Sequence, residues 1–321
     1  MNIDFIEASG IFTGKNTPDF SNCQISYRSF ETGRDCYSLQ GIQKIQLIHK
    51  PSNGMLVLRG SISYFFQGHN FSYDKKAFME AIDYISSLLK INIWQMDLNI
   101  LEAGVIYPVE VKPKDIITHH REGKGMTLHD NPKDKGNFRS FKDNYAFRKM
   151  YDAGRNIKMK QGLKRREIIQ RSGWNPDKEF IKWEIHYYKP HLLNKGKALK
   201  LYNLMNPHWE EILKADIKFQ YSLIIPMKTI IPPKVKSDLH AIDIFALELV
   251  ESKLNEGLII PEVKKLLYDR INSSPILSKA DKDARKRQVK AILDKLEESS
   301  ESMWDQSNKI NEALYGETSS S

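Results

Sequence analysis

Apolar and polar positions along the first 225 residues of this 321-residue chain follow two periods. Alternation with a period of two is typical of half-buried strands. It predicts strands over residues 3–11, 42–49, 55–66, 93–105, 145–152 and 179–188. Apolar residues spaced three and four apart predict one long helix over 74–90, capped by Ser72 or Asp74. Asn53 and Gly54 supply a turn between the second and third strands, so these form a β-hairpin.

The prolines after residue 225 divide the chain. Residues 226–237 hold three prolines, which is typical of a linker. Helical spacing then returns over 238–255, 261–271 and 279–298. We predict an α+β domain over 1–225, with a mostly antiparallel sheet and the long helix packed on it. A small all-helical domain over 238–300 and a disordered Ser- and Glu-rich tail over 301–321 follow.

Composition points towards polyanions as partners. Lys and Arg number 49 against 40 Asp and Glu, which gives a net charge of +9 and a pI near 9.2. Such a basic balance favours nucleic acid. Only Cys23 and Cys36 are present, which excludes a disulfide framework and a zinc site and fits a reducing compartment. The sequence has no secretion signal and no membrane-spanning apolar run, which predicts a soluble intracellular protein.

Residues 143–155 are the stretch most suited to phosphate chemistry. Alternation places Tyr145, Phe147, Lys149 and Tyr151 on one face of a short strand, and Gly154 allows a sharp turn after it. Two phenols and an ammonium therefore share a face. The alternative is a half-buried strand whose tyrosines pack on the core and whose lysine is solvated.

Acidic residues on two other strands are candidate metal ligands. Glu102 shares a face with aliphatic side chains, so it must be paired, protonated or metal-bound, unless the strand end reaches solvent. Glu184 and His186 are two apart and can reach one divalent cation, although a polar solvent face is the alternative. Asp4 is expected to be a solvated aspartate, with a metal ligand as the less favoured interpretation.

Basic residues are concentrated on both sides of the 145–152 strand. Residues 107–142 are predicted to form a mobile basic loop near a substrate, or a surface insertion without a role. After the strand, a cluster of cations can contact phosphates, with a solvated face as the alternative. These candidate DNA-binding residues are Lys158, Lys160, Lys164, Arg165, Arg166 and Arg171.

Five stretches match motifs of one family in order and approximate spacing over about residues 42–205. Residues 58–70 match its Gly-Ser-Leu segment with a following Gly and Asn, and residues 98–105 its Leu-Glu-aromatic-Gly-Val strand. Residues 145–155 are similar to a Tyr-x-x-Lys-Ile-Tyr-Asp-Lys-Gly signature, 180–185 to Leu-Arg-Phe-Glu-Ile and 198–204 to Leu-x-Asp-Leu. Together these stretches resemble the replication initiators of filamentous phages and small rolling-circle plasmids.

The resemblance implies DNA strand nicking at an origin. A tyrosine would attack a phosphodiester and leave a 5′-phosphotyrosine and a free 3′-hydroxyl. Mg²⁺ or Mn²⁺ would be held by Glu102 and Glu184, with His186 as a third ligand, and Lys149 would stabilise the phosphate charge or lower the pKa of the phenol. The nucleophile is expected to be Tyr145, then Tyr151, then Tyr202 on a later helix.

Three departures from the family weaken that assignment. Ala153 replaces the family lysine, Arg148 stands where an apolar residue is usual, and Phe138 is nearest to a tyrosine of the related plasmid initiators. The alternative is therefore a non-catalytic, sequence-specific DNA-binding protein that binds an origin or acts as a regulator. A third interpretation is a binder of RNA or acidic proteins.

The resemblance also implies partners and a location. The DNA partner would be an origin in single-stranded or hairpin form, in the cytoplasm of a bacterial host cell. A host helicase or polymerase is a candidate protein partner, and a homodimer is a candidate assembly. No membrane partner is expected.

Overall fold

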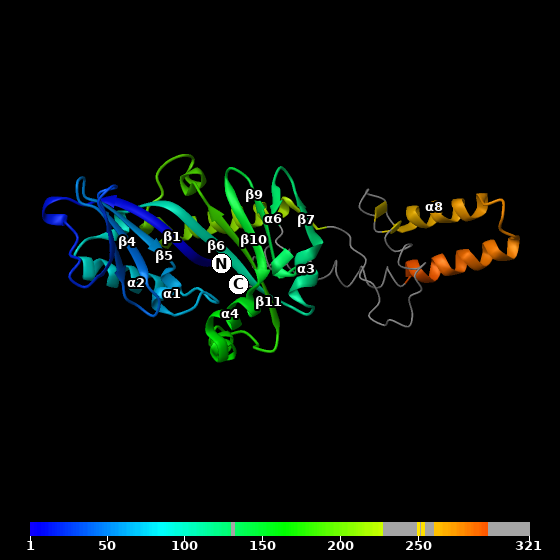
Figure 1. Cartoon of the computed structure of the whole chain (residues 1–321), viewed down its shortest axis with the longest axis horizontal. Coiled ribbons are helices and arrows are strands. Elements are labelled where there is room, and N and C mark those ends of the chain that lie inside the picture. Colours follow the sequence, from blue (N-terminus) through cyan, green and yellow to red (C-terminus); the bar gives the residue numbers. More distant parts are fainter. Residues whose placement is uncertain (130–131, 227–248, 251, 254–259, 295–321) are drawn as a thin grey trace. The chain divides into compact units, whose positions relative to one another are not determined.

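A mixed α and β structure with a large antiparallel sheet is seen in the computed structural model (Figure 1). It describes residues 1–129, 132–226, 249–250, 252–253 and 260–294. Contacts divide the chain into one unit of residues 1–118 and 123–224 and a second of residues 119–122 and 225–321.

Ten strands form the sheet in the order β2-β3-β4-β5-β1-β6-β11-β10-β9-β8, and each neighbouring pair is antiparallel. Their bounds are β1 Asn2–Ile11, β2 Gln24–Ser29, β3 Arg34–Leu39, β4 Ile45–Lys50, β5 Met55–Gly60, β6 Asp97–Val109, β8 Thr127–His129, β9 Phe138–Lys142, β10 Ala146–Asp152 and β11 Glu179–Tyr187. A separate two-stranded sheet pairs β7 (His120–Gly123) with β12 (Ile224–Pro226).

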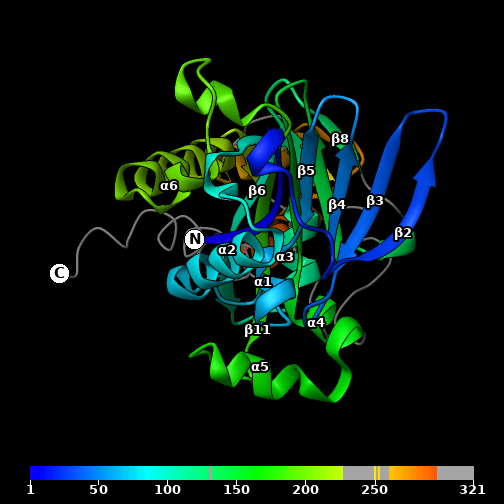
Figure 2. The ribbon, with the colours of Figure 1, turned by 90° about the vertical axis from the view of Figure 1, so that its left-hand side faces the viewer.

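Strand β1 lies inside the sheet, between β5 and β6. Its pairing with β6 shifts between Ile3 and Phe5, so Asp4 is an extra residue in the ladder, as in a β-bulge. The bulge turns Asp4 into the protein, where it is buried. The expectation of a solvated Asp4 is therefore wrong. The predicted strand over 3–11 is confirmed, whereas β2 and β3, at one edge of the sheet in Figure 2, were not predicted.

The helices are α1 Ile62–Phe66, α2 Lys75–Leu89, α3 Pro113–His119, α4 Ala153–Gln161, α5 Arg165–Arg171, α6 Pro207–Ser222 and α8 Ile260–Ser273, with residues 279–294 also helical. Short 3₁₀ turns are η1 Gly14–Asn16, η2 Ile93–Gln95, η3 Pro132–Asp134, η4 Gly162–Lys164, η5 Pro190–Asn194 and η6 Leu201–Met205. The helix predicted over 74–90 is confirmed by α2, and the Asp74 carboxylate caps it by accepting from the backbone N–H groups of Lys76 and Ala77.

Several expected segments differ from the structure, and the strand expected over 93–105 begins only at Asp97, after η2. The strand predicted over 55–66 ends at Gly60, whose φ of 153° suits only glycine, and Ser61 then caps α1 by accepting from the Tyr64 N–H. Residues 107–142 are not one loop, because β6 continues to Val109 and α3, β8 and β9 follow. The run of strand-forming residues in 62–66 and the many charges in 107–142 explain these errors.

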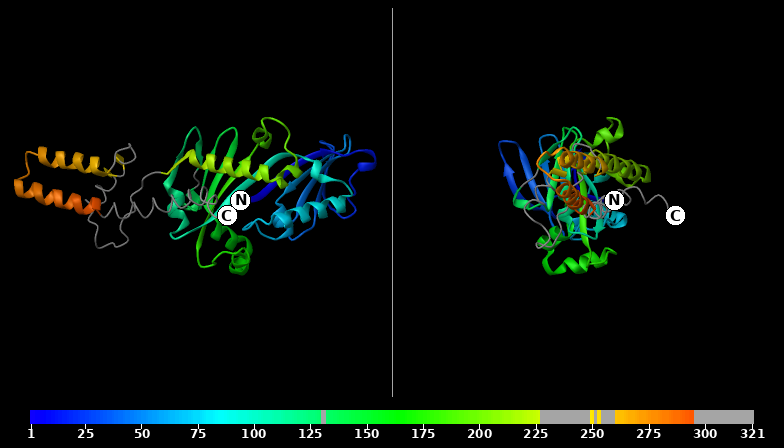
Figure 3. Two further views of the ribbon diagram at one scale, coloured as in Figure 1. Left: turned by 180° about the vertical axis from the view of Figure 1, so that it is seen from behind. Right: turned by 90° about the vertical axis from the view of Figure 1, so that its right-hand side faces the viewer.

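Helices α2 and α6 lie on the same side of the large sheet (Figure 3). On that side Trp183 of β11 contacts Tyr221 of α6 edge to face, and the guanidinium of Arg148 donates to the Gln220 carbonyl oxygen at 2.8 Å. Both residues lie on the sheet face opposite to Lys149 and Glu184, because side chains alternate along a strand. One face is thus closed by helices, and the other carries charged side chains.

In the second unit, α8 contains the predicted helix 261–271, and the helix over 279–294 falls within the predicted helix 279–298. Val263 and Leu293 are buried, and the Tyr268 hydroxyl donates to the backbone carbonyl of Lys286. The predicted linker lies outside the described residues apart from Pro226. Most of the predicted helix 238–255 and the whole tail 301–321 also lie outside them.

Candidate functional site

Three neighbouring strands bring the predicted acids and the predicted lysine together. In the register, Glu102 of β6 faces His186 of β11, and Glu184 of β11 faces Lys149 of β10. Gly104 lies opposite Glu184 on β6, where an added Cβ would be 2.4 Å from the Trp183 carbonyl oxygen. The close approach of β6 and β11 therefore needs glycine at this position. The expected placement of the two glutamates on neighbouring strands is confirmed.

The ammonium of Lys149 bridges the two glutamates. Lys149 Nζ is 2.9 Å from Glu102 Oε1 and forms a second, shorter ion pair with Glu184 Oε1. Burial acts to lower the pKa of Lys149, but the two carboxylates overcome this and raise the pKa well above 10.5. Lys149 is therefore a fixed positive charge at the centre of the site and is not solvated.

A second lysine pairs with the same glutamate. Lys182 of β11 is buried, pairs with Asp4 of β1, and lies 3.3 Å from Glu184 Oε2. Burial and the charge of Glu184 raise the pKa of Asp4, and Lys182 only partly offsets this. Burial would also raise the pKa of Glu184, but Lys182 and Lys149 hold it well below 4.5. The two lysines thus keep Glu184 ionised although it is buried.

Tyr151 of β10 places a phenol against this cluster. Its hydroxyl donates to Glu184 Oε2 at 3.1 Å. Burial, followed by the negative charge of Glu184, raises the pKa of Tyr151 well above 10. The phenol is therefore neutral at physiological pH, and a carboxylate lies in position to accept its proton.

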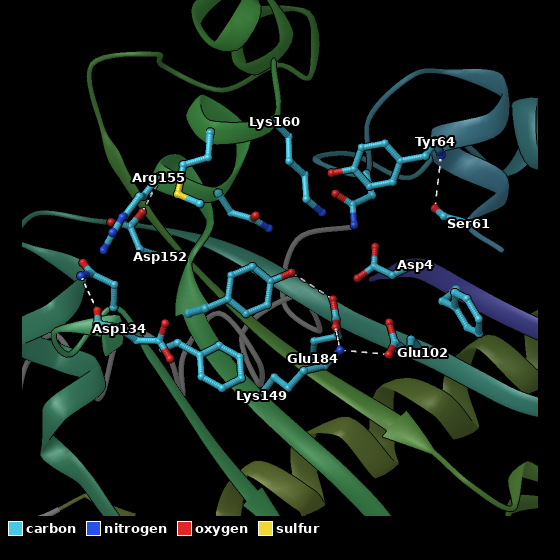
Figure 4. Close-up of a pocket in the computed structure, with 17 residues that line it drawn as sticks. Asp4, Ser61, Tyr64, Glu102, Asp134, Lys149, Asp152, Arg155, Lys160 and Glu184 are labelled. Atoms are coloured by element: carbon cyan, nitrogen blue, oxygen red, sulfur yellow. Dashed lines mark hydrogen bonds and ion pairs between the residues drawn. The ribbon is translucent and has the colours of Figure 1, made fainter. Parts of the chain in front are cut away.

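One open cavity of about 460 Å³ is lined by Asp4, Glu102, Lys149, Tyr151 and Glu184 among others (Figure 4). Its lining is mostly polar or charged, with aromatic rings among the polar groups. The lining residues are the acids Asp4, Glu102, Asp134, Asp152 and Glu184; the cations Lys149, Arg155 and Lys160; the polar residues Ser61, Asn70, Asn137 and Asn156; and Phe5, Tyr64, Phe138, Tyr151 and Met159. Four of the acids and Lys149 lie on strands of the sheet, Asp134 lies on η3, and Arg155 and Lys160 come from α4.

Tyr64 and Lys160 face each other across the cavity from α1 and α4 (Figure 4). Lys160 Nζ lies 5.0 Å from the centre of the Tyr64 ring, within cation–π range. Burial, with the charges of Asp4 and Glu184, raises the pKa of Tyr64 to about 12. Tyr64 was not predicted as a site residue, because residues 55–66 were expected to form a strand. Ser61, which caps the helix three residues before Tyr64, was the local sign of a helix.

The favoured nucleophile of the sequence analysis does not join this group. Tyr145 precedes β10, where Asp143 accepts from its backbone N–H, and its ring packs edge to face on Tyr187 on the α6 side of the sheet. Tyr202 on η6 is 46% exposed and does not line the cavity. Tyr151, the second choice, does line it. Phe138, which stands near a family tyrosine, is beside Tyr151 with ring centres 6.4 Å apart.

The predicted metal ligands are only partly brought together. His186 Nδ1 is 2.6 Å from Glu102 Oε1, but His186 is not among the residues that line the cavity. Within the described residues, no group of three or more His, Cys, Asp or Glu side chains is arranged to hold a metal ion. Lys149 occupies the space between Glu102 and Glu184, where such an ion would bind.

The predicted DNA-binding cations lie on α4, η4 and α5. Lys160 lines the cavity, whereas Arg166 and Arg171 form ion pairs with Asp177 and Glu167. Arg165 donates to the Gly154 carbonyl, so it supports the start of α4. The two others, Lys158 and Lys164, are exposed. The cluster therefore contains both solvated cations and cations used within the fold.

Comparison of the chain with protein-family models, with curated proteins and with solved structures finds no match. Among the helices in the described ranges, none combines the length and apolar character needed to cross a bilayer. The family resemblance therefore stays a prediction that rests on the motifs alone.

Proposed function

We propose that this chain is a replication initiator that nicks one DNA strand at an origin, as in rolling-circle replication. The observation that carries the proposal is the bond from the Tyr151 hydroxyl to Glu184 in a cavity that also contains Lys149. A phenol, a carboxylate that accepts its proton and a fixed cation are the groups that phosphodiester transesterification needs.

In the proposed reaction Tyr151 is the nucleophile. Glu184 accepts the phenolic proton, and the phenol oxygen attacks the phosphorus atom. The bond from phosphorus to the 3′-oxygen breaks, and the 3′-oxygen takes up the proton released from the phenol. The 5′ phosphate remains on Tyr151, and the free 3′-hydroxyl is a primer for a polymerase. The reaction needs no other reactant.

Cations around the cavity would bind the phosphate. Lys149 lies on the sheet beside Tyr151, and Arg155 and Lys160 lie on the opposite wall. Together they can neutralise the charge that develops on the non-bridging oxygens. The aromatic rings of Phe138 and Tyr64 offer flat surfaces on which an unpaired base can stack.

The resemblance also implies a divalent cation, but no group of three acidic or histidine side chains in the described ranges is arranged to hold one. Lys149 would have to leave the space between Glu102 and Glu184 before these residues, with His186, could hold Mg²⁺ or Mn²⁺. When bound, the ion would withdraw charge from the phosphate and help the phenol to ionise.

A nicking assay tests the proposal. Single-stranded and supercoiled DNA carrying the origin of the same genetic element would be incubated with the full chain and Mn²⁺. We expect a covalent protein–DNA adduct with the wild type that falls by about a thousandfold or more in Tyr151→Phe. Tyr145→Phe and Tyr202→Phe are matched controls outside the cavity and should keep the adduct. Tyr64→Phe shows whether the second phenol is needed.

An adduct that persists in Tyr151→Phe but disappears in another variant would reassign the nucleophile. No adduct with any cation, together with tight, salt-sensitive binding of the origin, would support a non-catalytic DNA-binding protein instead. One observation favours that alternative: the pKa of Tyr151 lies well above 10, so the free protein does not ionise this phenol.

We also propose roles for α2 and for the helices after residue 237. We take α2 as the long helix packed on the sheet, and the helices after residue 237 as a small domain. This domain would bind DNA, a host helicase or polymerase, or a second copy of the chain, in the cytoplasm of a bacterial host. Its helix over 279–294 carries Arg285 and Arg287 on exposed positions, which suits an anionic partner.

A further inference from the structure

Helix α4 has one face buried in the protein and another that lines the cavity. Ala153 and Ile157 are buried in an apolar cluster that includes Phe180 of β11, so the helix is held against the sheet. Asn156 and Met159 are three residues apart on the same helix, and both line the cavity. The α4 wall therefore presents an amide and a thioether to the strands across the cavity (Figure 4).

Met159 is an exposed apolar side chain at this cavity. It is 73% exposed, and covering it with a flat apolar group would be favourable. Phe138 and Tyr151 line the sheet side, with ring centres 6.4 Å apart and ring planes inclined by 26°. A nucleobase has two flat faces, so it can contact these rings on one face and Met159 on the other. The volume of about 460 Å³ is typical of sites for small organic groups.

Asparagine amides supply polar groups that could contact the edge of such a base. Asn137 already donates to the Asp134 carbonyl oxygen within its own turn. The side-chain amides of Asn70 and Asn156 make no hydrogen bond to other residues that the structure describes. An amide has a donor beside an acceptor, the pattern that pairs with N7 and the N6 amino group of adenine. Asn156 is the better placed of the two, because it lies one turn from Met159.

We propose that Asn156 selects the unpaired base beside the scissile phosphate, and that this base is adenine. The base would lie between Met159 and the rings on the sheet, with its edge against the Asn156 amide. Adenine alone presents a donor beside an acceptor on its Hoogsteen edge, where guanine presents two acceptors. Its purine face also covers more apolar surface than a pyrimidine does. Arg155 and Lys160, on the same helix, would contact the neighbouring phosphates.

Fluorescence anisotropy of labelled homo-oligomers of about ten nucleotides tests the inference, because every register then places the same base in the cavity. We expect the full chain to bind the deoxyadenosine oligomer about tenfold more tightly than the deoxycytidine or thymidine oligomer. Asn156→Ala should reduce this ratio to less than about twofold. Lys158→Gln, at an exposed position of the same helix, is the control: it should weaken all three oligomers equally and keep the ratio. Met159→Ala should weaken the deoxyadenosine oligomer by about threefold.

A second substitution at the same position tests the hydrogen-bond pattern. Asn156→Asp keeps the size of the side chain but replaces its donor by an acceptor, so the preference should move from adenine to cytosine. Equal affinities of the wild type for the three oligomers would overturn the inference. So would a ratio that persists in Asn156→Ala or that is lost only in Asn70→Ala. Deoxyadenosine monophosphate that binds as tightly as the oligomer would assign the cavity to a free nucleotide and would overturn the role in DNA.

The inference rests on the proposed function for DNA as the partner, but its test does not depend on nicking. Base preference is measured by the binding of homo-oligomers, and nicking is measured by the covalent adduct at the origin. A preference for adenine that Asn156→Ala removes, without an adduct, would sustain the inference and contradict the nickase. An adduct together with equal affinities for the three oligomers would do the reverse.

Discussion

Arg148 illustrates how a buried charge is satisfied on the closed face of the sheet. It is 1% exposed, yet its guanidinium donates to Gln220 and to the Ala146 carbonyl and pairs with Asp143 at 2.9 Å. The Asp143 carboxylate also caps the turn before β10. Burial acts to raise the pKa of Asp143, but its bonds with Arg148 and with the backbone lower it below 3.8. Arg148 therefore connects α6 to the strand that carries Lys149 and Tyr151.

Replacing Arg148 should destabilise the protein strongly. Arg148→Met removes the ion pair of Asp143 and leaves the buried Gln220 carbonyl oxygen without its guanidinium donor. We expect a loss of about 3–5 kcal/mol in the free energy of unfolding, measured by urea denaturation and tryptophan fluorescence. Arg171→Met is the control, because the Arg171 side chain is 75% exposed in its ion pair, and should cost less than about 1 kcal/mol. Similar losses in both variants would contradict this account.

Asp216 should make stability depend on pH. It accepts the Tyr187 hydroxyl bond at 2.7 Å, and burial raises its pKa above 3.8 although this bond acts to lower it. The folded protein then holds the proton more tightly than the unfolded chain, so ionisation of Asp216 reduces stability as pH rises from about 4. In Asp216→Asn the amide oxygen still accepts from Tyr187 and cannot ionise.

We therefore expect the stability of Asp216→Asn, relative to the wild type, to improve between about pH 4 and about pH 7. Urea denaturation at several pH values measures the difference. Asp177→Asn, at an exposed position, should show no comparable trend. A constant difference between Asp216→Asn and the wild type across this range would show that the Asp216 proton is not linked to folding.

The residues of the site were predictable to the extent that they follow strand alternation. Glu102, Lys149 and Glu184 lie on one face and meet because their strands are neighbours. Asp4 was not predictable, because its position depends on a bulge, and bulges leave no mark in a hydrophobic pattern. Tyr145 was misplaced because the strand begins one residue after it, so alternation did not apply.

Among the elements, β6 and β11 approach most closely at Gly104. Gly104→Ala should cost about 1–3 kcal/mol, because its Cβ would meet backbone atoms of Trp183 and Glu184. Gly154→Ala is the matched control. It lies in the first turn of α4, its nearest neighbour is the flexible end of Arg165, and alanine should be neutral or stabilise by up to about 1 kcal/mol. Thermal unfolding of both variants measures the difference in stability. A Gly104→Ala variant as stable as the wild type would contradict the close approach of β6 and β11.

We expect the cations of the α4–α5 segment to contribute unequally to DNA binding. If the chain binds DNA as proposed, exposed Lys158 and Lys164 contact phosphates, whereas Arg166 and Arg171 are already paired with acids. Lys158→Gln with Lys164→Gln should lower the slope of log affinity against log salt by about 1.5. Arg166→Gln with Arg171→Gln should lower it by clearly less. Equal effects in a filter-binding titration would show that the ion pairs open on binding.

Elements were predictable where pattern and local signals agree. The α2 helix has an apolar stripe and an aspartate cap, and the β4–β5 hairpin has an Asn-Gly turn. The α1 helix has five residues rich in strand formers, and only its serine cap and the glycine before it oppose a strand. Propensity cannot decide such short segments, because tertiary packing does.

For the molecule as a whole, β1 lies inside the sheet, so its side chains should contribute more to the free energy of unfolding than those of an edge strand. Ile6→Ala removes a fully buried side chain and should cost about 2–5 kcal/mol. Ile25→Ala on the edge strand β2 makes the same chemical change at a 46% exposed position and should cost less than about 1 kcal/mol. Comparable losses in urea denaturation would contradict the strand order.

That order also constrains how the protein is made. A ribosome releases β1 first, but its partners β5 and β6 end only at Gly60 and Val109. The growing chain therefore reaches the first partner of β1 only after about fifty further residues and the second after about a hundred, which takes seconds. Asp4 reaches Glu184 later still, after β11 has emerged. The cavity is thus assembled late, from the first and the last strands of the ten-stranded sheet to be synthesised.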